Sequence, residues 1–133
     1  MADCIFCKII KGEIPAHKVY EDKSVLAFLD IHPLNPGHII ITPKNHVDEW
    51  QDMSEDLFDH VMEAAQRLGR TLKIKLKPAR VGFWVEGFEV AHAHIHVSPL
   101  QNANDFSTKR TKAEMQAEPD NNALAAIAKK LTE

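Results

Sequence analysis

The sequence predicts an α+β protein in which an antiparallel sheet of five strands packs against one long helix, with short helices near both ends. Five short stretches rich in β-branched and aromatic residues are typical of strands. One long stretch repeats its apolar residues with the period of an amphipathic helix. Their order along the chain is helix, strands, long helix, strands, helix, and this order favours the α+β class with an antiparallel sheet.

The first half of the chain contains one short helix and three strands. The helix falls within 3–15, DCIFCKIIKGEIP, where apolar residues have helical spacing until Gly12 stops them. Strands over 18–22 and 24–31 follow, joined by a tight turn. A loop rich in Pro, Gly and Asn then leads to a β-branched strand over 38–43.

The second half contains the long helix, two strands and a terminal helix. The long helix covers 54–76, with Ser54 as its N-cap. Its apolar stripe consists of Leu57, Val61, Ala65, Leu68 and Leu72. Strands follow over 80–87 and 90–99, and the tail over 121–133 reads as a short Ala-rich helix. The intervening stretch is polar and is expected to be mostly loop.

Length and composition bound the function. With 133 residues, 44% of them hydrophobic, the chain is expected to form a single domain over 1–133. Its core would span about 3–100, and 101–133 would be a C-terminal extension. The net charge of −3 argues against nucleic-acid or membrane partners. No apolar run approaches the roughly 18 residues of a membrane span, and no signal peptide is evident, so a cytoplasmic location is expected.

Three histidines, His92, His94 and His96, stand at alternate positions of the strand expected over 90–99. Alternate strand residues share a face at about 7 Å spacing, so the three rings would form a row. The residues between them, Ala93, Ile95 and Val97, would then face the core. One alternative is a solvent-facing strand that happens to carry histidines. A straight row would span about 13 Å against metal–ligand bonds near 2 Å, so at most one of the three histidines is expected to bind a given metal unless the strand bends strongly.

The motif His92-Ala-His94-Ile-His96-Val-Ser resembles the His-φ-His-φ-His-φ-φ pattern of the histidine triad (HIT) family, where φ is apolar. Upstream segments are similar to HIT segments in the family's order, and the resemblance covers roughly 3–100. The match is nearest to a zinc-binding, bacterial-type branch related to the Hint nucleoside phosphoramidases. It implies a HIT-like fold for the predicted five-stranded sheet.

The resemblance also implies an activity. HIT proteins attack the α-phosphorus of a nucleotide and release the group attached to it, through a nucleotidyl-histidine intermediate that water cleaves. The family's nucleophile maps to His94, and its last triad histidine, which donates to the phosphate and helps the leaving group, maps to His96. His38 matches the family histidine beside the nucleophile. The expected substrate is a purine nucleoside monophosphate joined to an amine or to further phosphates.

The nucleoside site follows from the same resemblance. Asp30 matches a family carboxylate that accepts hydrogen bonds from the ribose hydroxyls. The apolar walls that enclose the base match Ile5, Phe6, Ile9, Phe28 and Ile31. For these five residues plain core packing is an open alternative, because apolar stripes belong to cores more often than to pockets.

A zinc site is the third implication. The Cys4-x-x-Cys7 motif by itself indicates metal or redox chemistry. In zinc-bearing HIT proteins the ligand positions correspond to Cys4, Cys7, His46 and His92, a closed Cys2His2 set that would hold a structural Zn²⁺. A thioredoxin-like redox pair and reduced thiols packed as small apolar groups are the alternatives.

The chain departs from the family pattern before the triad. Glu86 and Glu89 stand where many HIT proteins carry Asn, Gly or Gln, and acidic groups near a phosphate are unfavourable unless they face away or bind a cation. A nucleotide-binding regulatory module with weak catalysis and a zinc-stabilised interaction domain are therefore the alternative functions. The resemblance further implies a homodimer, with Phe83 and Trp84 on opposite faces of a strand near its interface.

Overall fold

The computed structural model describes residues 3–108, 110 and 112–133. Its strands are β1 (Lys18–Glu21), β2 (Val25–Leu29), β3 (Ile39–Pro43), β4 (Arg80–Trp84) and β5 (Ile95–Leu100). They form one antiparallel sheet of five strands in the order β1-β2-β3-β5-β4. The predicted α+β fold with a five-stranded antiparallel sheet is therefore confirmed.

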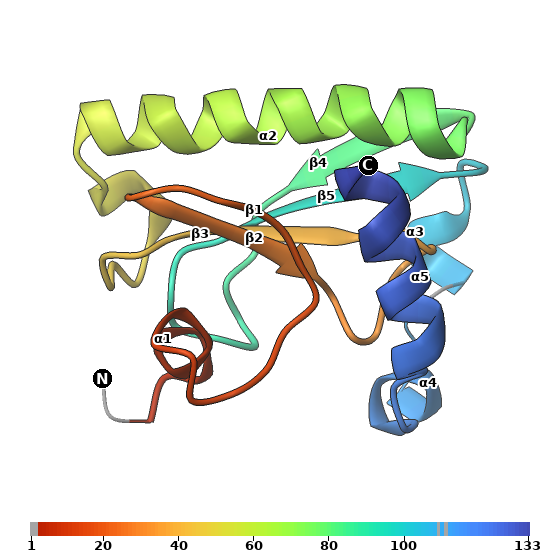
Figure 1. The fold of residues 1–133 in the computed structure, drawn as a ribbon, viewed down its shortest axis with the longest axis horizontal. Coiled ribbons are helices and arrows are strands. Elements are labelled where there is room, and N and C mark those ends of the chain that lie inside the picture. The colour runs from red at the N-terminus through yellow and green to blue at the C-terminus, as the bar shows by residue number, and fades with distance from the viewer. Residues whose placement is uncertain (1–2, 109, 111) are drawn as a thin grey trace.

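The long helix α2 (Glu55–Leu76) covers one face of the sheet (Figure 1). The Ser54 side chain caps it by accepting the Leu57 N–H, as the sequence predicts. Four of the five stripe residues are buried, and Leu57 is partly buried. They share one core with Ala93, Ile95 and Val97, so the residues between the triad histidines do face the core.

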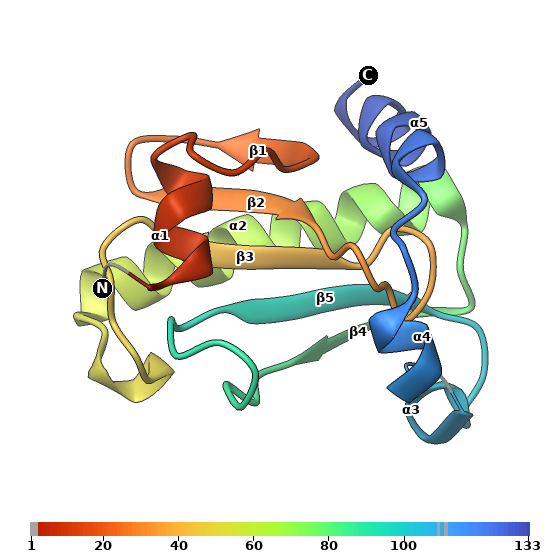
Figure 2. The same cartoon turned by 90° about the horizontal axis from the view of Figure 1, so that it is seen from below.

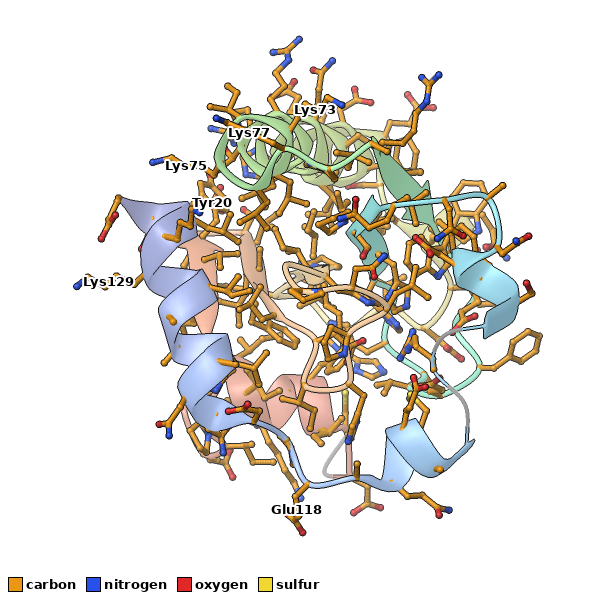
Figure 3. All side chains as sticks on the ribbon, turned by 90° about the vertical axis from the view of Figure 1, so that its right-hand side faces the viewer. Tyr20, Lys73, Lys75, Lys77, Glu118 and Lys129 are labelled. Atoms are coloured by element: carbon orange, nitrogen blue, oxygen red, sulfur yellow. The ribbon has the colours of Figure 1, made fainter. Side chains whose placement is uncertain are left out.

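The opposite face of the sheet carries the short helix α1 (Ile5–Ile10) and a smaller core (Figures 1 and 2). The terminal helix α5 (Asn121–Thr132) packs beside β1 and contacts α2. Figure 3 shows Lys75 of α2 and Lys129 of α5 on the outside of the molecule. None of the helices in the described ranges is long and apolar enough to span a membrane.

The strand expected over 90–99 is shorter at its start than the sequence predicts. It begins at Ile95, so His92 and His94 lie in an extended segment before it. The backbone groups of Ala93 are taken by another part of the chain: its N–H donates to the Val47 carbonyl (2.6 Å), and its carbonyl accepts from the Thr42 hydroxyl (3.0 Å). The ladder to β3 therefore stops, but the alternation of faces continues. The strand expected over 80–87 likewise ends at Trp84.

Three short helical segments lie in stretches that were expected to be loops. The stretch 101–120 contains α3 (Asp105–Thr108) and α4 (Lys112–Gln116), and a 3-10 turn covers Trp50–Asp52. The polar extension is therefore partly folded against the rest of the molecule.

The first helix starts at Ile5 rather than at the beginning of 3–15, because the Cys4 sulfur accepts the Cys7 N–H and makes Cys4 the N-cap.

Candidate active site and metal centre

The three triad rings are buried inside the molecule and do not form a solvent-facing row. His92, His94 and His96 expose 0%, 4% and 3% of their surface. The apolar cavity that His94 and His96 line lies on the α1 side of the sheet. The alternative of a solvent-facing strand is therefore wrong.

His96 belongs to a hydrogen-bond chain whose direction is fixed. The Leu34 backbone N–H donates to Nδ1 of His38 (2.9 Å), so that nitrogen carries a lone pair. A neutral His38 must then carry its proton on Nε2, which lies 2.8 Å from His96 Nδ1 and donates to it. The His96 proton is thus on Nε2, a buried donor for which the described residues supply no acceptor.

Burial keeps both members of this chain neutral. Desolvation, with smaller contributions from the neighbouring His94 and Arg110, lowers the pKa of His96 to about 3. Burial also lowers the pKa of His38, well below the ordinary histidine value. A neutral imidazole accepts at one ring nitrogen and donates at the other, so two such rings can form a hydrogen-bonded chain. Two imidazolium rings would instead repel each other.

His94 is held in the opposite tautomer. Its Nδ1 lies 2.6 Å from the His92 carbonyl, which can only accept, so Nδ1 carries the proton and Nε2 carries a lone pair. Burial lowers the pKa of His94 and favours the neutral ring. A neutral imidazole with one nitrogen free and the other held by an acceptor is the form that nucleophilic catalysis requires.

Aromatic rings fix the positions of these imidazoles. Phe6 meets the His94 ring edge-on with centroids 4.9 Å apart, and Trp84 stacks on His96 at 5.0 Å with planes 7° apart. Sequence reasoning placed Trp84 only in relation to a dimer interface. Trp84 pairs with His96 across β4 and β5, and an aromatic residue on the neighbouring strand was the one available signal.

Two cysteines and two histidines form a cluster beside the triad. The ligand atoms of Cys4, Cys7, His46 and His92 all lie within 4.8 Å of one another. His92 Nε2 donates to the Pro43 carbonyl (2.8 Å), which leaves Nδ1 bare, 3.3 Å from the Cys4 sulfur and 3.6 Å from the Cys7 sulfur. His46 Nδ1 lies 3.3 Å from the Cys7 sulfur.

This donor set fits zinc. Bonds of about 2.3 Å to sulfur and 2.0–2.1 Å to nitrogen, at a tetrahedral angle, separate the two ligand atoms by about 3.6 Å. The observed sulfur–nitrogen distances of 3.3–3.6 Å agree with that value. The bond from His92 to a backbone carbonyl is the outer contact typical of zinc-bound histidines. Both cysteines are free thiols, and burial, reinforced by Cys4, raises the pKa of Cys7.

A second group, Asp30, His38 and His96, also brings three ligand-type atoms within 4.8 Å. Here the two facing ring nitrogens already bond to each other at 2.8 Å, so neither offers a free lone pair to an ion. The Asp30 carboxylate lies 3.7 Å from His38 and 3.2 Å from the Arg110 guanidinium. The group is therefore a hydrogen-bonded cluster.

The cavity in front of His94 and His96 has apolar walls and one buried carboxylate. All five residues that sequence reasoning assigned to the base line it. Phe6, Ile9 and Phe28 also belong to the smaller core, whereas Ile5 and Ile31 are 45% and 46% exposed and form the rim. Core packing therefore explains the apolar character of Phe6, Ile9 and Phe28 only in part. It does not explain that of the exposed Ile5 and Ile31.

Asp30 lines this cavity and is 6% exposed. Burial raises its pKa, against the opposing effects of the His32 N–H and Arg110. Its Oδ1 accepts that N–H at 2.8 Å and its Oδ2 faces Arg110. A carboxylate has about four acceptor positions, so the described contacts leave room for a diol.

The two acidic residues of the departing segment have different surroundings. Glu89 lines the cavity in front of His94 and His96 and forms an ion pair of 3.8 Å with Arg110. Glu86 is exposed on a second cavity behind His94, lined also by Asp48, Trp50 and Phe88. Sequence reasoning missed Arg110, because nothing in the local sequence around it indicates a site.

Comparisons of the sequence and of the structure with known proteins point to the same family. The family model described as "HIT domain" matches residues 11–103. An uncharacterized HIT-like protein of Borreliella burgdorferi is 39% identical over 117 residues, covering 83% of this chain and 84% of the relative. An adenosine 5′-monophosphoramidase of Saccharomyces cerevisiae is 39% identical over 102 residues, covering 76% and 65%. The crystal structure of a Zn-bound histidine triad family protein from Mycobacterium smegmatis superimposes with a TM-score of 0.80 at 27% identity, covering 98% and 91%.

Proposed function

Because this chain belongs to the histidine triad family, we propose that it is a nucleotide hydrolase or transferase that cleaves at the α-phosphate of a purine nucleoside monophosphate conjugate. The observation that carries the proposal is the pair of tautomers at the triad. His94 offers a bare Nε2 and His96 offers an Nε2–H without a partner among the described residues. A lone pair and a donor at the same cavity are what an attack on a phosphate needs.

In the proposed reaction, His94 Nε2 attacks the α-phosphorus, and a phosphorus–nitrogen bond forms as the bond to the leaving group breaks. The Nε2–H of His96 donates to a phosphate oxygen and assists the leaving group, while the Leu34–His38 chain holds it in the donor tautomer. Water then attacks phosphorus, the phosphorus–nitrogen bond breaks, and the nucleoside monophosphate leaves. Two displacements replace one difficult step.

The remaining cavity residues would bind the nucleoside. Asp30 would accept hydrogen bonds from the ribose hydroxyls at its free acceptor positions. Phe6, Ile9 and Phe28 would form the inner wall for the base, and Ile5 and Ile31 its rim. The kinship with a phosphoramidase of S. cerevisiae supports an adenosine phosphoramidate as the first substrate to try.

We further propose that Cys4, Cys7, His46 and His92 hold a structural Zn²⁺. The metal would supply a fixed cross-link between α1 and the segment before β5. His92 joins this site to the nucleophile, because its ring faces the thiols while its carbonyl accepts a hydrogen bond from His94 Nδ1–H. Cysteines that serve as zinc ligands and form no disulfide suit a reducing compartment, which supports a cytoplasmic location.

We also propose a single domain that acts as a homodimer. β4 is an edge strand, and Phe83 on it is 50% exposed next to an apolar hollow shared with α2. The hollow is lined by Met62, Ala65, Gln66, Gly69, Val81, Phe83 and Val97. A second copy that pairs β4 with β4 would cover both the unpaired edge and this apolar surface.

The test is turnover of adenosine and guanosine phosphoramidates and of dinucleoside polyphosphates by wild type and by His94→Asn. Wild type should release the nucleoside monophosphate and give a nucleotidyl adduct in intact-protein mass spectra with a slow substrate. His94→Asn should show neither, and His17→Asn, a change at a histidine bonded to Asn121 on α5, should behave as wild type.

Each contrary result is informative. Turnover by His94→Asn at the wild-type rate would remove the nucleophile assignment. Nucleotide binding by wild type without turnover of any substrate would favour the regulatory module. No nucleotide binding, together with one zinc per chain, would favour the interaction domain.

A further inference from the structure

Arg110 reaches the candidate site from outside the segment that the family model matches, which ends at residue 103. Its guanidinium lies 3.2 Å from Asp30 Oδ2 and 3.8 Å from Glu89 Oε2, and both carboxylates line the nucleoside cavity. The Arg110 side chain is 12% exposed. Its backbone has φ 57°, a left-handed conformation, and its N–H donates to Glu114 at 2.8 Å.

Without Arg110 the cavity would be hostile to a phosphate. Glu89 and Asp30 place two carboxylates on its lining, where Glu89 contributes to the raised pKa of Asp30 and both negative charges would repel an incoming anion. The guanidinium between them offsets that charge. It also lies near enough to His38 and His96 to lower the pKa of each ring.

Arg110 also retains unused hydrogen-bonding capacity. A guanidinium carries five N–H donors, and the described residues leave its Nε buried with no acceptor. Buried donors nearly always have a partner in a complete complex. Phosphate oxygens are the acceptors that a guanidinium pairs with best.

We propose that Arg110 is a substrate-binding residue that supplies the positive charge against which the cavity binds a nucleoside 5′-phosphate, with Glu89 as the carboxylate that holds it in place until the phosphate arrives. The inference rests on the proposed nucleotide function and deepens it. It explains how an acidic residue is tolerated where many HIT proteins have a neutral one. It also gives the C-terminal extension a role in the site, because Arg110 contacts two carboxylates of the cavity and Met115 of α4 is one of the lining residues.

The groups that would bind the phosphate differ from those that would bind the nucleoside. Arg110 engages Oδ2 of Asp30, whereas Oδ1, which accepts the His32 N–H and keeps a second acceptor position, and the apolar wall remain for the ribose and the base. Removal of the guanidinium should therefore weaken binding of AMP and leave binding of adenosine nearly unchanged. An arginine that merely stabilised the fold would affect both ligands equally.

The experiment is isothermal titration of AMP and adenosine, at pH 8 and low salt, into zinc-loaded full-length wild type, Arg110→Ala, Arg110→Lys and the double variant Arg110→Ala/Glu89→Gln. Arg110→Ala should weaken AMP binding about 10–100-fold, the loss of a charge-assisted contact, and adenosine binding less than about twofold. Arg110→Lys should lie between, because it keeps the charge but not the planar fork. In the double variant part of the AMP affinity should return, since the repelling carboxylate is gone.

Lys129→Ala is the matched control, because it removes one positive charge from the outer surface of α5, where Figure 3 shows Lys129 projecting into solvent. Equal losses of AMP and adenosine affinity in Arg110→Ala would overturn the inference, as would tighter AMP binding, the result expected if Arg110 only plugs the cavity. If Arg110→Ala bound AMP as tightly as wild type, the inference would be overturned but the proposed function would stand. Failure of wild type to bind either ligand would instead refute the proposed function as well.

Discussion

His38 Nε2 lies 2.8 Å from His96 Nδ1, and the Leu34 backbone N–H decides which of the two nitrogens donates. A peptide N–H can never accept, so the protons of both rings follow from one backbone contact. The chain ends in a His96 donor inside the cavity. The chemistry of the candidate site thus depends on a turn before β3 as much as on the triad.

His38→Ala should therefore lower kcat more than it raises KM. The variant removes the donor that keeps the His96 proton on Nε2, and about a tenfold to hundredfold loss of kcat is expected for a misdirected proton donor. Nitrogen-15 NMR of the imidazoles should show His96 protonated on Nε2 in wild type and a mixture of tautomers in the variant. Unchanged kcat together with a mixed tautomer would show that the chain is structural only.

Zinc removal should affect both stability and activity. Chelation or Cys4→Ser should release the tie between α1 and His92, whose carbonyl holds His94 at 2.6 Å. Each tenfold loss of zinc affinity costs about 1.4 kcal/mol of stability when zinc is in excess. Thermal melting with elemental analysis of one zinc per chain measures the effect, and reloading the chelated wild type with Zn²⁺ is the control. An unchanged melting temperature at zero zinc would refute the metal site.

The patterns that could be predicted from the sequence are those with local periodicity. The stripe of α2 and the core-facing Ala93, Ile95 and Val97 follow from side-chain periods of 3.6 and 2 residues. The start of β5 does not, because the backbone of Ala93 bonds to Val47 and Thr42, which are distant in sequence. Local propensity cannot anticipate which backbone groups a distant loop will take.

The residues of the candidate site that were not predicted are also placed by contacts between distant parts of the chain. Trp84 reaches His96 through strand register, and Arg110 reaches Asp30 across 80 residues. Neither contact has a signature in its own neighbourhood. The resemblance to a family supplied the four metal-type ligands and the cavity walls, but it could not supply Arg110, which lies beyond the matched segment.

Phe83→Glu should convert a dimer into a monomer. The side chain is 50% exposed on the edge strand β4, and a carboxylate there would have to be desolvated in the proposed interface. Light scattering after size-exclusion chromatography gives the mass of each form. Ile74→Glu, at another exposed apolar position on α2 outside the hollow, should stay dimeric. A monomeric wild type would contradict the interface.

Gly37→Ala should destabilise the fold more than Gly12→Ala. Both glycines have positive φ, +100° and +82°, so each variant carries backbone strain of about 1 kcal/mol. A Cβ at Gly37 would also lie 2.5 Å from the Leu76 side chain, whereas none lies within 4 Å at Gly12. Urea unfolding should show a loss larger by about 1–3 kcal/mol at Gly37. Equal losses would mean that Leu76 moves aside freely.

The hairpin between β1 and β2 should make stability depend on pH through Asp22. Burial alone would raise the pKa of this carboxyl, but hydrogen bonds from the Tyr20 hydroxyl, the Ser24 and Val25 amides and His60 hold it well below the ordinary value of 3.8. A pKa lowered by folding stabilises the protein above the unfolded value and loses that effect as pH falls through the folded value. Asp22→Asn should therefore cost about 1–3 kcal/mol of unfolding free energy at pH 7, and the gap to wild type should shrink below pH 3.8. Urea titrations at pH 7, 5 and 3 measure the gap, and Glu118→Gln, at a surface position labelled in Figure 3, should show none at any pH. A gap that stays constant with pH would mean that the stability lost in Asp22→Asn does not depend on the charge of Asp22.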